Sequence, residues 1–243
     1  MSVLRGLLFD KDGTLIDFDR TWGPAAYAVM QVLAEGDRPK LERLMAVSHY
    51  IEEERRFLPS SPLIAGSSAA YGPLWAAALG RLPGRAFFSE MDTLFRLEGL
   101  RALRPIGDPA RIAEELAGMG YDLGIATNDA EASAKAQAEA LGIGRFFRFV
   151  AGYDSGFGAK PNPGMITAFA RSLGVEAARV AMIGDSAYDL IAARSAGAVA
   201  IAVLSGPLGD AARSELAPLA DHVADSIAEL PSLLRTIAAG KRA

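Results

Sequence analysis

The stretch that decides the fold is residues 3–15, where an apolar run ends at Phe9 and Asp10-Lys11-Asp12-Gly13-Thr14 follows immediately. A short apolar run that meets a turn signal is typical of a β-strand buried on both faces. Ligands of open α/β sheets bind beyond the carboxyl ends of such strands. The polar residues after Phe9 are therefore candidates for a functional site.

Further short apolar runs occur later in the chain, with helix-like stretches between them. Strands that alternate with helices form a parallel sheet, because each helix provides the crossover to the next strand. The pattern predicts a doubly wound, Rossmann-like α/β core. Its strands are expected at Val3 to Phe9, Tyr121 to Ala126, Phe147 to Gly152, Val180 to Ile183 and Val199 to Val203.

The segment between the first two runs looks helical throughout and is too long for a single crossover. We expect an inserted helical cap domain over residues 18–103 and a catalytic core formed by residues 1–17 and 104–243. Asp108 before Pro109 predicts a helix start where the chain returns to the core. The cap helices are expected at Thr21 to Ala34, Pro39 to Phe57, Ser68 to Leu79 and Gly84 to Leu97.

The composition limits the possible partners. Lys and Arg total 25 against 29 Asp and Glu, so the net charge of -4 predicts no nucleic-acid partner. No stretch has the length and apolar character of a membrane span. The absence of cysteine excludes disulfides and thiolate metal sites and fits a cytoplasmic protein. His49 and His222 have no partners at metal-ligand spacing.

Polar residues also follow the later strands. Thr127 and Asn128 come after the second run, a Gly-rich loop after the third leads to Lys160, and Asp185 and Asp189 follow the fourth. Because the carboxyl ends of parallel strands share one rim, all of these residues should converge with Asp10. Pro161 after Lys160 breaks the spacing of a nucleotide-binding P-loop, so that class is rejected.

The converging carboxylates point to a metal-assisted reaction. Asp10 and Asp12 can face the same side, because successive strand residues alternate. With Asp185 and Asp189 nearby, so many anions would repel without a cation such as Mg²⁺. Asp10 is ionised at neutral pH and could attack phosphorus, while Asp12 could act as general acid and base. Lys160 and the Thr127 hydroxyl could stabilise the transferring phosphoryl group.

Each segment alone has a structural explanation. Asp-Lys-Asp-Gly is an ordinary turn composition, Thr127 could simply cap a helix, and Asp185 with Asp189 could begin one. A lone lysine is usually a surface charge. The four segments in this order nevertheless favour one site over four coincidences.

Together the four segments resemble the signature motifs of the haloacid dehalogenase superfamily. Phe9 to Leu15 is similar to the first motif, Thr127 to the second, Lys160 to the third, and Asp185 with Asp189 to the fourth. The resemblance implies that Asp10, the Asp12 main-chain carbonyl and Asp185 hold Mg²⁺, with Asp189 supporting the metal site and Lys160. It also implies that Thr127, Asn128 and Lys160 bind the substrate, and that the helical insertion is a mobile cap.

Within that superfamily the chain most resembles the phosphoglycolate phosphatases, which implies a small phosphorylated metabolite as substrate. Asp12 disfavours the dehalogenases and phosphonate-cleaving members, which lack an acid at that position. Arg20, Arg55 and Arg56 are candidates for reading a substrate carboxylate. Two alternatives stay open: a β-phosphoglucomutase-like phosphosugar mutase, and a non-catalytic binding protein on the same fold.

Overall fold

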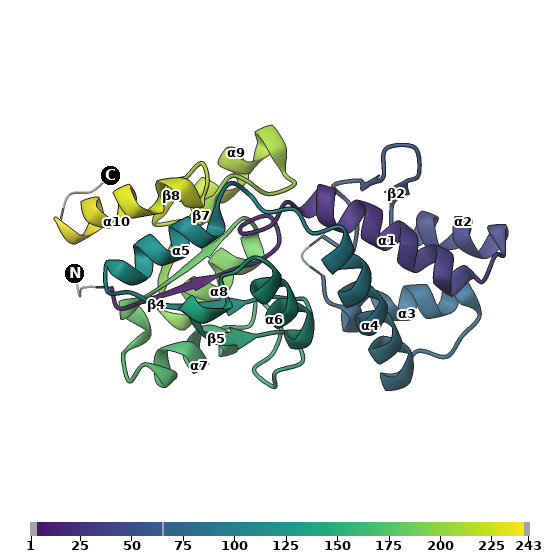
Figure 1. The fold of residues 1–243 in the computed structure, drawn as a ribbon, viewed down its shortest axis with the longest axis horizontal. Coiled ribbons are helices and arrows are strands. Elements are labelled where there is room, and N and C mark those ends of the chain that lie inside the picture. Colours follow the sequence, from purple (N-terminus) through teal and green to yellow (C-terminus); the bar gives the residue numbers. More distant parts are fainter. Residues whose placement is uncertain (1–3, 65, 241–243) are drawn as a thin grey trace. The chain divides into compact units, whose positions relative to one another are not determined.

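The computed structural model describes residues 4–64 and 66–240, which divide into two compact units (Figure 1). One unit comprises the residues up to Asp17 together with those from Pro105 onward, and the other comprises Phe18–Arg104. We call the first the α/β unit and the second the helical unit. The chain therefore leaves the α/β unit soon after its first strand and returns to it once.

The α/β unit is built on a parallel sheet that has six strands among the described residues, in the order β5-β4-β1-β6-β7-β8. This confirms the predicted doubly wound fold. Val3, the first residue of the predicted β1 run, lies outside the described residues. The sixth strand was not predicted. The strands are β1 Gly6–Phe9, β4 Asp122–Ala126, β5 Phe147–Ala151, β6 Val180–Gly184, β7 Val199–Val203 and β8 His222–Ala224.

Helices pack on both faces of this sheet. Helix α7 contacts α8, whereas α5 contacts α10. Every residue of β6 is buried, and Val180 and Met182 belong to one apolar cluster with Phe169 of α7 and Leu190 of α8. Burial on both faces explains why the strands read as unbroken apolar runs. The helices are α5 Pro109–Gly118, α6 Glu131–Ala140, α7 Gly164–Ser172, α8 Ala187–Ala196, α9 Ala212–Leu216 and α10 Leu230–Ala238.

The strand order places a topological switch point at β1. The chain builds β4 and β5 on one side of β1 and then β6, β7 and β8 on the other. The connections therefore diverge at the carboxyl end of β1, which is where open α/β sheets bind ligands. Asp10 is the residue that follows β1 there.

The helical unit contains long helices packed around aromatic side chains. Trp75 is fully buried and donates a hydrogen bond from Nε1 to Ser48 Oγ at 2.9 Å. Its ring lies 5.5 Å from that of Phe95, measured between centroids. The elements are α1 Phe18–Ala34, α2 Arg38–Val47, β2 Tyr50–Ile51, β3 Arg56–Phe57, α3 Ser68–Leu79 and α4 Arg85–Arg101.

The predicted helix from Pro39 to Phe57 is wrong in its second half. Helix α2 ends at Val47, and His49 has a left-handed backbone with φ of 49°. The chain then forms the β2–β3 hairpin, in which the Tyr50 and Phe57 rings lie 5.2 Å apart and nearly perpendicular. The packing of these aromatic side chains thus outweighs the helical pattern of the sequence.

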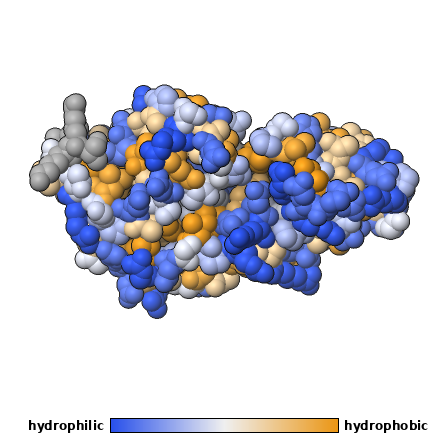
Figure 2. Space-filling model, turned by 90° about the horizontal axis from the view of Figure 1, so that it is seen from above, coloured by the Kyte–Doolittle hydropathy of each residue, from blue (hydrophilic) through white to orange (hydrophobic). Residues whose placement is uncertain are grey.

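Among the described residues, no helix combines the length and hydropathy needed to cross a bilayer. On the face drawn in Figure 2, hydrophilic residues cover most of the surface and hydrophobic ones form patches between them. Exposed apolar side chains such as Leu82, which is 89% exposed, are common on folded proteins.

Candidate active site

Asp10 lies at the end of β1, and its carboxylate contacts a buried lysine. The Asp10 backbone N–H donates to the Ile183 carbonyl of β6 at 2.7 Å, which extends the β1–β6 ladder up to the site. Asp10 Oδ1 lies 2.6 Å from Lys160 Nζ, and both side chains are almost fully buried. A buried ion pair of this geometry fixes the carboxylate in one orientation.

Asp189 holds the other side of the same lysine. Its Oδ1 lies 2.6 Å from Lys160 Nζ. Its Oδ2 accepts hydrogen bonds from the Ser186 backbone N–H at 3.1 Å and the Ser186 hydroxyl at 2.6 Å. The contact with the Ser186 backbone N–H belongs to a capping box at the start of α8. The Asp189 carboxylate thus caps the start of α8 and also pairs with Lys160.

Asp185 follows β6 directly, and the backbone at two glycines approaches its carboxylate closely. Its Oδ1 accepts a hydrogen bond from the Thr14 hydroxyl at 3.1 Å. A Cβ at Gly13 would lie 2.2 Å from Asp185 Oδ2, and one at Gly206 would lie 2.0 Å from the same oxygen. Gly13 also has φ of 78°, which other residues rarely adopt. Both glycines leave room for the carboxylate.

Lys160 is positioned by its main chain as well as by its side chain. The Asn128 side chain donates from Nδ2 to the Lys160 carbonyl at 2.9 Å and accepts from the Lys160 backbone N–H at 2.8 Å. Asn128 comes directly after Thr127 at the end of β4. This double contact, which we call the Asn128 clamp, joins the loop after β5 to the end of β4.

Asp12 lies beside Thr127 and a second buried lysine. Its Oδ2 accepts a hydrogen bond from the Thr127 hydroxyl at 3.4 Å, and its Oδ1 lies 2.7 Å from Lys11 Nζ. Lys11 Nζ also lies 3.1 Å from Asp129 Oδ2. The Asp129 backbone N–H donates to the Thr127 hydroxyl at 3.0 Å. Asp12 is therefore held by residues from the ends of β1 and β4.

Burial and like charge dominate the electrostatics of the site. Burial, followed by the neighbouring Asp189 carboxylate, raises the pKa of Asp10 to about 7, although Lys160 opposes the shift. Burial and the Asp10 carboxylate raise the pKa of Asp185 well above its usual range. Burial alone would lower the pKa of Lys160, but Asp10 and Asp189 outweigh it and raise that pKa. The lysine is therefore charged at neutral pH.

The acidic cluster has the chemistry of a cation site. Oxygen atoms of Asp10, Asp185 and Asp189 all lie within 4.8 Å of one another, and all three residues are buried. Lys160 supplies one positive charge against these three carboxylates. A hard cation that prefers oxygen ligands would relieve the remaining repulsion. The residues present therefore fit a divalent metal.

The structure brings together every core residue that the sequence singled out. Asp10, Asp185, Asp189 and Lys160 form one group, and Asp12 with Thr127 lies next along β1 and β4. Sequence reasoning assigned Asn128 to the substrate, whereas its amide is engaged with the Lys160 main chain. It gave no role to other residues that shape the site. These are Lys11, Thr14, Asp129, Ser186 and Gly206.

The three arginines proposed for carboxylate recognition are spread over the helical unit. The Arg55 guanidinium lies 3.5 Å from the centroid of the Tyr27 ring, and Arg56 pairs with Glu54 at 2.6 Å. Arg20 lines a cavity of about 310 Å³ within the unit, together with Arg101 and Arg104.

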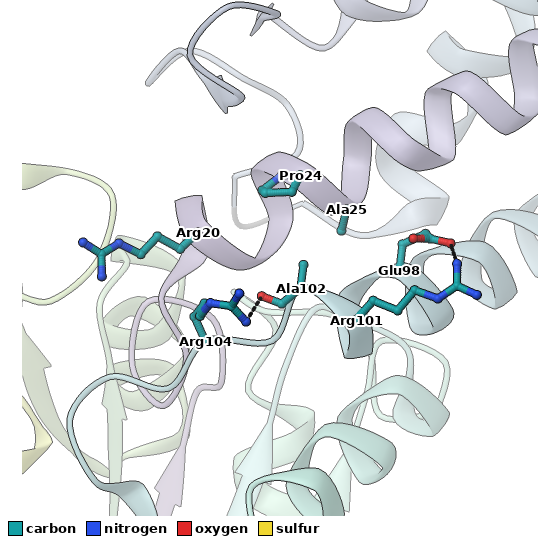
Figure 3. A pocket seen from close by; sticks show the side chains of 7 residues that line it. All are labelled: Arg20, Pro24, Ala25, Glu98, Arg101, Ala102 and Arg104. Atoms are coloured by element: carbon teal, nitrogen blue, oxygen red, sulfur yellow. Dashed lines mark hydrogen bonds and ion pairs between the residues drawn. The ribbon is translucent and has the colours of Figure 1, made fainter.

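The arginines of that cavity do not form a joint anion site. Figure 3 shows the Arg20 and Arg101 side chains extending in opposite directions. Arg101 pairs with Glu98 at 2.5 Å, and Arg104 donates to the carbonyls of Ala102 and Leu103. Recognition of a carboxylate by Arg20, Arg55 or Arg56 stays a prediction.

Comparison with known proteins agrees with the motifs. A family model described as haloacid dehalogenase-like hydrolase matches residues 4–197. The chain is 32% identical over 206 residues to the probable phosphatase IndB of Dickeya dadantii, covering 82% of this chain and 81% of that protein. It is 32% identical over 207 residues to a phosphoglycolate phosphatase of Rhodospirillum rubrum, covering 83% and 79%.

A solved structure agrees with the fold. The chain is similar to a protein from Haemophilus somnus 129pt described as a predicted phosphoglycolate phosphatase, with a TM-score of 0.70 and 19% identity. The alignment covers 96% of this chain and 99% of that one. At this identity the likeness concerns the fold alone.

Proposed function

The chain belongs to the haloacid dehalogenase-like hydrolases, and from this premise we propose that it is a magnesium-dependent phosphatase acting on a small phosphomonoester. Two relatives that align over most of their length support the reaction class, since both are named as phosphatases. The name of the Rhodospirillum rubrum relative favours phosphoglycolate, or a similar small phosphorylated acid, as the substrate.

The observation that carries this proposal is the fixed pair of Asp10 and Lys160. The Asp10 carboxylate sits at the switch point of the sheet with the Lys160 ammonium 2.6 Å away. A buried carboxylate beside a fixed cation is a suitable nucleophile for a phosphoryl group, whose negative charge the cation stabilises. Asp12 stands two residues on and is available for proton transfer.

The proposed reaction has two steps. A carboxylate oxygen of Asp10 attacks phosphorus, the bond from phosphorus to the leaving oxygen breaks, and Asp12 donates a proton to that oxygen. An aspartyl phosphate on Asp10 results. Asp12 then accepts a proton from water as the water attacks phosphorus, which restores the Asp10 carboxylate and releases inorganic phosphate. Lys160 and the Thr127 hydroxyl contact the phosphoryl oxygens in both steps.

Mg²⁺ would be held by Asp10, Asp185 and the Asp12 main-chain carbonyl, with Asp189 supporting the cluster. Bound there, it supplies positive charge that neutralises the carboxylates and the substrate phosphate. Asp189 already uses both oxygens on Lys160 and Ser186, which favours the supporting role.

The test is phosphate release from a panel that includes phosphoglycolate, hexose phosphates and p-nitrophenyl phosphate, with Mg²⁺ and with chelator. We expect turnover that requires Mg²⁺. Asp10→Asn should abolish it without unfolding the protein, because it removes the nucleophile and retains the side-chain shape. Asp210→Asn, at an exposed position of the same unit, is the matched control.

Intact-protein mass spectrometry after a rapid acid quench should detect a phosphoryl adduct in the wild type and none in Asp10→Asn. Wild-type turnover by Asp10→Asn would refute the mechanism. Slow hydrolysis combined with dependence on a sugar bisphosphate would identify a phosphosugar mutase instead. Lack of turnover on every phosphomonoester, despite Mg²⁺ binding, would favour the non-catalytic alternative.

A further inference from the structure

The proposed reaction uses Asp10 and Asp12 but gives no task to Lys11, which stands between them. The Lys11 side chain is only 2% exposed, although lysine is among the residues least often buried. Taking an ammonium group out of water costs several kcal/mol unless charged partners compensate. Packing alone therefore does not explain a lysine at this buried position.

Lys11 bridges two carboxylates that come from different parts of the chain. Its Nζ lies 2.7 Å from Asp12 Oδ1 and 3.1 Å from Asp129 Oδ2. Asp129 is itself anchored, because its Oδ1 accepts a hydrogen bond from the Ala130 backbone N–H at 2.7 Å at the start of α6. The ammonium therefore connects Asp12 to a carboxylate fixed on another element.

The two oxygens of Asp12 have different contacts. Lys11 holds Oδ1, while Oδ2 lies 3.4 Å from the Thr127 hydroxyl. The Asp129 backbone N–H also donates to that hydroxyl at 3.0 Å, so Asp129 helps to orient both neighbours of Asp12. Two fixed contacts at opposite oxygens define the plane of the carboxylate.

We propose that Lys11 is a positioning residue that, anchored by Asp129, holds the Asp12 carboxyl group in the orientation from which its protonated form donates a proton to the leaving oxygen. This inference rests on the proposed function. Lys11 does not touch the substrate in this scheme. Its effect should therefore depend on how much the leaving group needs a proton.

The dependence on the leaving group separates positioning from a merely structural role. An alkyl phosphate such as phosphoglycolate releases a poor leaving group that needs the proton from Asp12. p-Nitrophenyl phosphate releases a stable phenolate that needs little help. General acid catalysis contributes about 10²- to 10⁴-fold where it is used.

The variant for the test is Lys11→Met, which keeps an unbranched side chain of similar length. Removing the ammonium leaves Asp129 without its ion pair and could impair folding, so the double variant Lys11→Met/Asp129→Asn is made as well. Lys135→Met is the matched control, because Lys135 is an ion-paired lysine on the surface of α6.

We expect both Lys11 variants to lose on the order of 10²-fold in kcat on phosphoglycolate and less than about 3-fold on p-nitrophenyl phosphate. Mg²⁺-dependent thermal stabilisation should be retained. Crystal structures of the double variant should show the Asp12 carboxylate turned away from the Thr127 hydroxyl.

Equal losses on both substrates would show that Lys11 only stabilises the fold and would overturn the inference. So would an unchanged Asp12 orientation, or a gain of activity on phosphoglycolate, which would mean that the ammonium restrains the acid. A wild-type protein inactive on every phosphomonoester of the panel would reject the proposed function, and this inference with it. Selective loss on phosphoglycolate in an active enzyme supports both.

Discussion

Substitution of Gly206 by alanine should weaken metal binding by displacing Asp185. A Cβ at Gly206 would lie 2.0 Å from Asp185 Oδ2, whereas ordinary contacts of this kind begin at 3.4 Å. The carboxylate must therefore withdraw by about 1.4 Å or rotate away from the cluster. Alanine is otherwise acceptable at this position, since the backbone of Gly206 is not left-handed. The added methyl group thus acts on the Asp185 carboxylate.

The size of the effect follows from the role of Asp185. Disturbing a residue that orients a metal ligand typically costs about 10- to 100-fold in metal affinity. Asp185 would be displaced itself, so we expect at least this loss, equivalent to about 1.4 to 2.7 kcal/mol of binding free energy. The Thr14 hydroxyl, which donates to Asp185 Oδ1 at 3.1 Å, would lose its partner as well.

Two measurements check this prediction, namely the Mg²⁺ concentration for half-maximal phosphatase activity and the rise in unfolding temperature on adding Mg²⁺. Gly118→Ala is the matched control, because a Cβ at Gly118 in α5 meets no atom within 4 Å. It should bind Mg²⁺ like the wild type. If Gly206→Ala also did so in both measurements, Asp185 would not be a metal ligand and the assignment of the cluster would fail.

The remaining predictions concern the charge of Asp10 and the placement of Lys160. Burial raises the pKa of Asp10 to about 7 in the folded protein, against an ordinary value of 3.8. The folded state holds more protons between these values, so in chelator the unfolding free energy should fall by up to about 4 kcal/mol as the pH rises from 4 to 7. Urea titrations should reveal this decline in the wild type and a shallower one in Asp10→Asn, and a flat wild-type profile would contradict the role given to burial. Asn128→Ala removes the Asn128 clamp and should lower kcat by roughly 10- to 100-fold with little change in KM, because displacing Lys160 by about 1 Å is sufficient. Steady-state kinetics measure both constants, and an unchanged kcat would mean that the side-chain ion pairs alone position Lys160.

The sheet could be predicted because its strands are buried on both faces. Val199 to Val203 reads as one apolar run and forms β7 with the same bounds. The clustering of the candidate site residues could be predicted because each one follows such a strand or its loop, where parallel strands share a rim. Apolar runs and the turn residues that bound them are local properties of the chain, and they were sufficient to predict these elements.

The parts that could not be predicted depend on contacts between distant residues. Lys11 and Asp129 lie in separate loops, and nothing in either loop indicates that their charges meet in the interior. The hairpin after α2 depends on the packing of Tyr50 against Phe57, which overrides a helical pattern. Strand β8 spans three residues, too few for alternation or length to indicate a strand.

The central place of β1 has a consequence for how the protein is made. During synthesis β1 emerges from the ribosome before either of its partners, β4 and β6. Residues 18–104, which form a compact unit by themselves, are translated in the interval. During this interval both edges of the apolar strand β1, Gly6–Phe9, are unpaired. Unpaired apolar strands in nascent chains are prone to aggregate or to recruit chaperones. Strand β1 therefore waits longer for its first partner during synthesis than any later strand of the sheet, each of which can pair with a strand already made.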